Sequence, residues 1–227
     1  QSGQMPNRVD FTPILLGAEA SSRLASIDPS FPTGNVNFLG VPFVIPTTGN
    51  NVVWNNDGPP TGTIIKNFPV GIVGVTQVHT LLNTTFGQPG PSSYLRLEFF
   101  GAAGAYYTVA LIGNVDIRDL NPHVWTNAIN GTSTVNVFIS ALRYRMDKQT
   151  IDLPPEFAQQ TLTSIRMIDT GAFNFQRAVL NGITVASIPL DPGGSFTLAA
   201  PGVLANDHDP DGDPLTARLV TPPATAA

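Results

Sequence analysis

Four aspartates alternate with other residues near the C-terminus, in the run Asn206-Asp-His-Asp-Pro-Asp-Gly-Asp213. Carboxylates two residues apart can turn their oxygens toward one point when the backbone turns tightly, and Gly212 permits such a turn. Clustered oxygens are the ligands that Ca²⁺ prefers, although the closing glutamate and flanking helices of an EF-hand are missing. We therefore expect a Ca²⁺ site with ligands from Asn206, Asp207, Asp209, Asp211 and Asp213. The alternative is a solvated acidic turn between two strands.

Two tryptophans stand beside polar residues that could recognise a sugar. The first opens the run Trp54-Asn-Asn-Asp57, at the end of a short strand-like segment. An aromatic ring can stack on the apolar face of a sugar while amides and carboxylates meet its hydroxyls. The candidate ligand-binding residues are Trp54, Asn55, Asn56 and Asp57, with Trp125, near Asp119, Asn121 and His123, as a second site. The alternative is that both tryptophans close the ends of a β-sandwich.

Signatures of catalysis are absent from the sequence. The chain has no cysteine and no Gly-x-Ser-x-Gly elbow, and its three histidines are far apart, at 79, 123 and 208. His79 lies in an apolar run and is expected to be a packed, hydrogen-bonded core residue rather than a base. Carboxylates such as Asp119 and Asp169 could serve a glycosidase only in pairs, and the sequence does not pair them. We expect no enzymatic activity.

The composition of the chain excludes some classes of binding partner. Only 12% of the 227 residues are charged, the net charge is −5, and two lysines are present. Without a basic cluster, binding to nucleic acid or to an anionic membrane is not expected. No apolar run approaches the roughly 20 residues that span a bilayer.

The pattern of apolar runs and turns predicts strands almost throughout. Gly and Pro contribute 21 residues each, and they separate short β-prone segments. The expected strands cover residues 11–16, 38–45, 52–54, 63–65, 74–82, 94–100, 106–112, 134–144, 149–153, 164–169, 178–186 and 195–199. The segment 134–144 is interpreted as one long, mostly buried strand, and Tyr144 as a core residue. Short helical turns are expected within 18–27 and 155–160.

This pattern predicts an all-β fold, an antiparallel β-sandwich of jelly-roll type with extended N- and C-terminal arms. The expected organisation is an arm over residues 1–30, the sandwich over 31–188, and an incomplete segment over 189–227. A fragment of about 30 residues, such as the stretch 191–221, cannot bury a core of its own. Strand-forming arms could instead pair with the sheet edge of a neighbouring copy, which repeated head to tail would build a filament.

Two stretches resemble known families. The order of Asn37-Phe-Leu-Gly-Val-Pro-Phe43, Tyr94-Leu-Arg-Leu97 and Asp116-Ile-Arg-Asp-Leu120 is similar to galactose-binding-like jelly-roll modules, over about residues 35–187. The run 202–216, with its alternating aspartates, resembles the start of a cadherin-like, tandem-95 type bacterial Ig-like repeat, over about 191–221.

These resemblances imply a role outside the cell. Both kinds of module occur in large secreted or cell-surface bacterial proteins, where they act in adhesion, spacing or glycan binding, and the repeat implies Ca²⁺ near its junction. The expected function is a non-catalytic extracellular structural or adhesive module, with carbohydrate binding near Trp54 and Trp125 as the alternative. The expected partners are other copies of the chain, neighbouring domains of the same surface protein, or glycans.

Overall fold

The computed structural model describes residues 8–54, 62–90, 93–123, 126–171 and 175–188, together with Pro214 and Thr216. The chain divides into two units, Gln1–Pro189 and Leu190–Ala227. The fold described below is that of the first unit. The strand expected at 195–199 lies outside the described residues.

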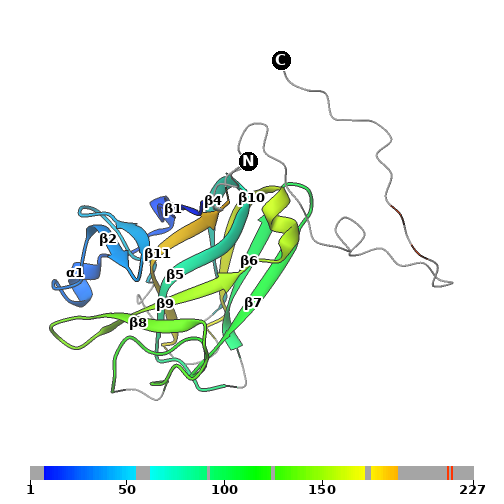
Figure 1. The fold of residues 1–227 in the computed structure, drawn as a ribbon. Helices are drawn as coiled ribbons and strands as arrows, with labels where there is room; N and C mark the ends of the chain where they lie inside the picture. The colour runs from blue at the N-terminus through cyan, green and yellow to red at the C-terminus, as the bar shows by residue number, and fades with distance from the viewer. Residues whose placement is uncertain are drawn as a thin grey trace. The chain divides into compact units, whose positions relative to one another are not determined.

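In the described part of the first unit, the regular elements are mostly strands (Figure 1). They are β1 (Asp10–Ile14), β2 (Gly34–Phe38), β3 (Val41–Ile45), β4 (Ile64–Val73), β5 (Val75–Thr85), β6 (Ser93–Gly101), β7 (Tyr106–Ile112), β8 (Thr134–Ile139), β9 (Arg145–Asp152), β10 (Thr161–Asp169) and β11 (Arg177–Ser187). Three short helical turns join them: η1 (Gly17–Glu19), α1 (Leu24–Ile27) and η2 (Pro155–Gln159).

Nine of the described strands form two layers, and β2 and β3 pair as a separate two-stranded sheet. A five-stranded sheet has the order β1-β11-β5-β9-β8, and a four-stranded sheet has the order β4-β10-β6-β7. Every pairing between the named strands is antiparallel. The predicted all-β antiparallel sandwich is therefore confirmed.

The main core lies between the two sheets. Along β6, Leu95, Leu97 and Phe99 are buried in this core, whereas the side chain of Arg96 is 46% exposed. This alternation follows from the pleat of a strand, which sends successive side chains to opposite faces. From the other sheet, Val78 of β5 is fully buried in the same cluster.

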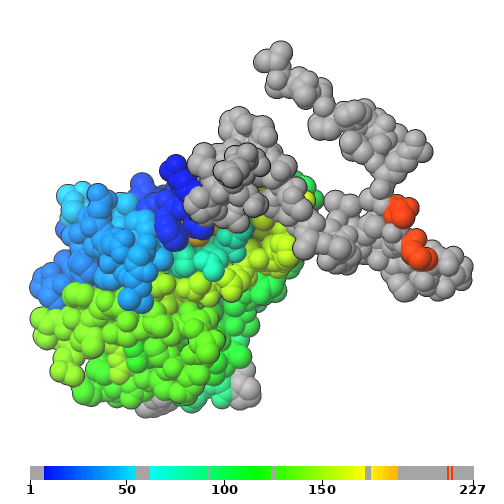
Figure 2. Space-filling model, viewed as in Figure 1, coloured from blue at the N-terminus to red at the C-terminus, as the bar shows by residue number. Residues whose placement is uncertain are grey.

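A second core covers the outer face of the five-stranded sheet. Its buried residues come from α1, from β3, from the sheet strands beneath them, and from the segments after α1, β3 and β7; they are Leu24, Phe31, Val41, Phe43, Ile45, Val52, Leu81, Leu120, Met146 and Val179. In Figure 2 the hairpin and α1, in shades of blue, lie against the rest of the sandwich. Gly182 lets this cover approach closely, because a Cβ there would stand 3.1 Å from Phe43. All eleven residues of β11 are consequently buried.

The expected single strand over 38–45 is wrong. Residues 34–45 form the β2–β3 hairpin, whose turn is made by Leu39 and Gly40, with φ of 56° and 83°. Two successive residues with positive φ are typical of the tight turn that suits the twist of a hairpin. The sequence hid this turn because a leucine occupies its first central position.

The long buried strand expected over 134–144 is also wrong. β8 ends at Ile139, pairs only with β9, and is largely exposed along its length. Its apolar residues lie on a sheet edge, where one side has no strand neighbour.

The strand β4 is much longer than the expected 63–65. It tolerates Pro69 because it is an edge strand of its sheet. On the open side of an edge strand, a backbone N–H has no neighbouring strand to bond, so proline, which lacks this N–H, costs no hydrogen bond there.

The N-terminal segment joins the five-stranded sheet. The sequence assigns residues 1–30 to an arm outside the sandwich. In the structure, β1 pairs with β11 from Asp10↔Ser187 to Ile14↔Ile183. This part of the segment covers the edge of β11, whose backbone groups would otherwise lack a partner on that side.

His79 is packed as expected for a core residue. It is 4% exposed, its Nδ1 lies 3.2 Å from Thr150 Oγ1, and its ring centroid is 5.9 Å from that of Phe11. Burial lowers the pKa of His79 to about 4, and the charge of Lys148 acts in the same direction.

We expect His79 to make the fold sensitive to acid. Between pH 6.5 and about 4 the unfolded chain binds a proton at His79 that the folded chain does not. Its contribution to the free energy of unfolding is therefore fully present above pH 6.5. This contribution falls by on the order of 3 kcal/mol as the pH drops to about 4. Urea unfolding at pH 4.5 and 7 should show a weaker acid loss in His79→Gln than in the wild type. The exposed His123→Gln serves as the control, and an unchanged loss in His79→Gln would contradict the assignment.

Candidate functional site

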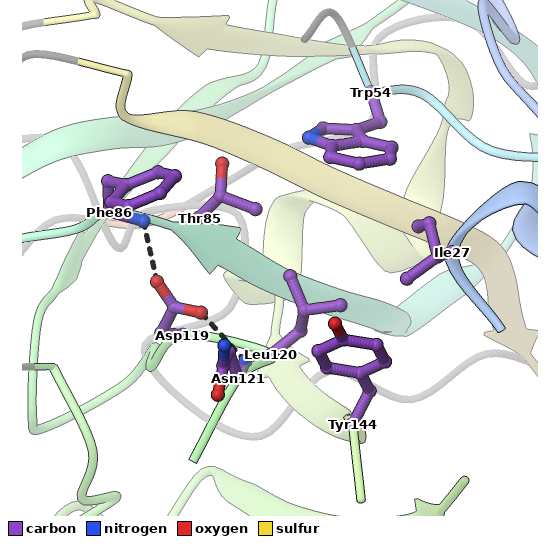
Figure 3. A pocket seen from close by; sticks show the side chains of 8 residues that line it. All are labelled: Ile27, Trp54, Thr85, Phe86, Asp119, Leu120, Asn121 and Tyr144. Carbon is purple, nitrogen blue, oxygen red and sulfur yellow. Dashed lines mark hydrogen bonds between the residues drawn. The ribbon is translucent and has the colours of Figure 1, made fainter. Parts of the chain in front are cut away.

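A pocket opens where β5 ends and β9 begins. Eight of the described residues line a hollow of ≈ 180 Å³ (Figure 3). They come from α1, the segment after β3, the end of β5 and the residue after it, the loop after β7, and the turn before β9. They are Ile27, Trp54, Thr85, Phe86, Asp119, Leu120, Asn121 and Tyr144. Aromatic rings and polar groups thus meet from segments that are distant in sequence.

The loop after β7 is pinned to the end of β5 by backbone hydrogen bonds. Thr84 N donates to Arg118 O at 3.1 Å, and Leu120 N donates to Thr84 O at 2.9 Å. Arg145 N donates to Leu120 O at 2.8 Å. Residues 118–120 are therefore bonded both to the end of β5 and to the start of β9. This fixes the position of the pocket floor.

A buried ion pair anchors the same loop. Asp147 on β9 is fully buried, and Arg118 donates to it twice, through Nε at 2.7 Å and Nη2 at 2.8 Å. Asn83 Nδ2 and Asn136 Nδ2 donate to the same carboxylate at 2.8 and 3.0 Å. A buried carboxylate is tolerated when several donors satisfy its oxygens. The pairing holds Arg118 against the sheet and, with it, the neighbouring Asp119.

Asp119 ties together two walls of the pocket. One carboxylate oxygen accepts a hydrogen bond from Phe86 N at 2.5 Å, and the other accepts one from Asn121 N at 2.7 Å. The residue is 2% exposed, and burial raises its pKa to about 6, against the lowering effect of these two bonds and of the Arg145 charge. Asp119 is thus mainly a carboxylate at neutral pH.

Trp54 forms the opposite wall. Its backbone N–H donates to Ser21 Oγ at 3.0 Å, and its indole packs against the second core. The indole nitrogen is buried, and none of the described residues accepts a hydrogen bond from it. Figure 3 shows this nitrogen on the side of the indole that faces Thr85 and Phe86. An unsatisfied buried donor of this kind is unusual in a folded protein.

The structure brings the two sequence candidates together in part. Trp54 shares one pocket with Asp119 and Asn121, which precede the second candidate tryptophan in the sequence. His123, from the same stretch, is exposed and does not line the pocket. The other predicted binding residues, Asn55, Asn56, Asp57 and Trp125, lie outside the described residues.

Five of the described lining residues were not singled out from the sequence; they are Ile27, Thr85, Phe86, Leu120 and Tyr144. Tyr144 was expected in the core of a strand, but it lies in the turn between β8 and β9. Thr85 is the last residue of β5 and Phe86 follows it, and nothing in the sequence pattern marks either as a pocket residue. The signal that could have found Phe86 is Gly87, which follows it and suggests a turn.

The predicted Ca²⁺ ligands, Asn206, Asp207, Asp209, Asp211 and Asp213, lie outside the described residues. Within the described ranges, His, Asp and Glu side chains form no group of three or more that could hold a metal ion. None of the helices in those ranges has the length and apolar character to cross a membrane.

Comparison with protein-family models and with curated proteins finds no match for this chain. The pocket geometry therefore carries the functional argument.

We expect Asp119 to give the fold a pH dependence opposite to that of His79. The folded state holds a proton on Asp119 up to about pH 6, whereas the ordinary value is 3.8. Its contribution to stability is thus full below pH 3.8 and is lost as the pH rises through 6, by on the order of 2–3 kcal/mol. Relative to the wild type, Asp119→Asn should be more stable at pH 7 than at pH 4.5 in urea unfolding. If the variant and the wild type change equally between the two pH values, the buried carboxylate does not titrate as described.

Proposed function

We propose that this chain is a non-catalytic binding module that holds a saccharide ring in the pocket beside Trp54. The observation that carries the proposal is the convergence of an indole, a carboxylate and an amide on one hollow of ≈ 180 Å³. In this proposal the module belongs to an extracellular or cell-surface protein and serves adhesion to glycans, as the sequence resemblances imply.

The lining suits the two-sided chemistry of a sugar. A pyranose ring has an apolar face of C–H groups and a rim of hydroxyls. Trp54, Phe86 and Tyr144 offer aromatic surface for the face. Asp119 and Asn121 offer polar groups for the rim. The hollow is smaller than the roughly 300–1,000 Å³ of sites for drug-sized ligands, which suits a single ring.

The polar groups of the pocket favour binding over hydrolysis. A glycosidase needs two carboxyl groups that flank the bond to be cleaved. The described lining contains one, Asp119, and both of its oxygens already accept backbone hydrogen bonds from the pocket walls. In this proposal, Asp119 shapes the site and stabilises bound hydroxyls but transfers no proton.

Assembly into filaments through the terminal arms receives less support from the described geometry. The strand β1, within the predicted N-terminal arm, already pairs with β11 of its own chain. This segment would have to leave its own sheet before it could add to another copy. Saccharide binding requires no such rearrangement.

We expect Trp54→Ala to weaken saccharide binding while the fold persists. Loss of a stacking indole should lower affinity by about tenfold or more, because aromatic contacts of this kind contribute on the order of 1 kcal/mol beyond their buried area. Glycan-array screening followed by isothermal titration calorimetry would measure this, and Trp54→Phe should retain part of the affinity. The matched control is Tyr106→Ala on β7, an aromatic residue that is 52% exposed and does not line the pocket. A wild type that binds no glycan would overturn the proposal.

We also propose that the Asp-rich run binds Ca²⁺, which the sequence alone supports. Replacing Asp209 and Asp211 together by Asn should weaken Ca²⁺ binding, because two carboxylate ligands are lost. Calorimetric titration with CaCl₂ should span about 10⁻⁴–10⁻³ M, the range of extracellular Ca²⁺ modules. Asp10→Asn, which removes an exposed carboxylate from β1, is the control for a general loss of negative charge. Equal Ca²⁺ binding by the double variant and the wild type would rule out this assignment.

A further inference from the structure

Two exposed phenylalanines contact each other beside the pocket. Phe86 is 52% exposed and Phe175 is 54% exposed, and their ring centroids are 5.9 Å apart at an interplanar angle of 56°. They lie together because they flank the same end of two paired strands, where Arg177 of β11 stands opposite Thr85 of β5. Phe86 lines the pocket, and Phe175 is not among its lining residues. The pair therefore extends aromatic surface from the pocket outward.

Both phenylalanines have a backbone conformation that large side chains rarely adopt. Their φ values are 50° for Phe86 and 61° for Phe175, in the left-handed region where glycine is favoured. The other described non-glycine residues with positive φ are Leu39, Asn114 and Arg143. Asparagine tolerates this region, and the other two lie in the tight turns of the β2–β3 and β8–β9 connections. Among the described non-glycine residues with positive φ, Phe86 and Phe175 are the aromatic ones, and their rings contact each other.

Local hydrogen bonds impose the strained conformation. Asp119 accepts from Phe86 N at 2.5 Å, and Thr85 Oγ1 donates to Phe175 O at 3.4 Å and to Arg177 O at 3.3 Å. The backbone is thus held while each ring keeps about half of its surface in solvent. Glycine would relieve the strain at either position and would remove exposed apolar surface. Stability therefore does not explain the aromatic side chains, and strain of this kind is concentrated at functional sites.

We propose that Phe86 and Phe175 form a second sugar subsite, continuous with the pocket, so that the ligand is a saccharide of at least two rings. This inference rests on the proposed function, because the first ring occupies the pocket beside Trp54. The second ring stacks its C–H face on the phenylalanine pair, outside the pocket. This pair offers aromatic surface without a side-chain hydrogen-bonding group. It therefore raises the affinity for longer saccharides, whereas the polar groups of the pocket select which sugar occupies the first position.

The test compares single rings with short chains of the same sugar. The probes are glucose, mannose, galactose and N-acetylglucosamine, each beside the disaccharide and tetrasaccharide built from it, titrated calorimetrically into the wild-type chain. We expect the oligosaccharide to bind about five- to tenfold more tightly than the single ring, as expected for one added aromatic stack.

The decisive variant is Phe175→Gly, because Phe175 lies outside the pocket lining. It should bring the oligosaccharide affinity down to that of the single ring while the single-ring affinity stays unchanged. Its thermal midpoint should equal or exceed that of the wild type, because glycine suits the positive φ. Tyr106→Ala, which removes an equally exposed aromatic ring from β7, should leave both affinities unchanged.

The possible results separate the two proposals. If the wild type binds no probe, the proposed function fails. If it binds single rings and oligosaccharides equally, or if Phe175→Gly keeps the wild-type preference for longer chains, the second subsite is overturned and the pocket proposal stands. A lower thermal midpoint in Phe175→Gly would show that the ring serves stability, and this would also overturn the second subsite.

Discussion

The five-stranded sheet carries apolar side chains on both faces, and each face must be covered. The four-stranded sheet covers one face, and the β2–β3 hairpin with α1 covers the other. As a result β11 is buried along its whole length and β5 along nearly all of it. Burial of apolar surface on this scale is the dominant favourable term in folding. The positions of the hairpin, of α1 and of Trp54 all follow from this requirement.

Covering a sheet on both sides creates a difficulty where its central strands end. Backbone and polar groups at the ends of β5 and β9 are then removed from water and need partners within the protein. Arg118, Asp147 and Asn83 meet this need as a hydrogen-bonded cluster, and residues 118–120 continue the backbone pairing. The loop that results is fixed in position. It carries Asp119 and Asn121 to the same hollow as the tryptophan of the outer cover.

The sequence predicted most of the strands and the sandwich correctly, but it predicted poorly where turns fall and which strands lie at the sheet edges. Alternating apolar residues between turn signals identified most strands of the two sheets, because that pattern reflects the pleat itself. Errors arose where local chemistry disagreed with the pattern. Leu39 occupies a turn position normally given to glycine or asparagine, and Pro69 interrupts a strand that tolerates it at a sheet edge. Apolar residues in β8 suggested burial, yet burial depends on which strands become neighbours, and the sequence does not state that order.

The pocket could be predicted only in pieces, because its parts meet through tertiary packing. Trp54 and Asn121 were recognisable as residue types suited to sugars, but their convergence depends on the cover and on the anchored loop. The walls are tied by hydrogen bonds within the protein before any ligand arrives, since Asp119 bonds both Phe86 and Asn121. A site held in this way loses little conformational entropy on binding, so more of its contact energy remains as affinity. In the proposed saccharide site, the buried polar cluster would thus act on binding by holding the pocket walls in place.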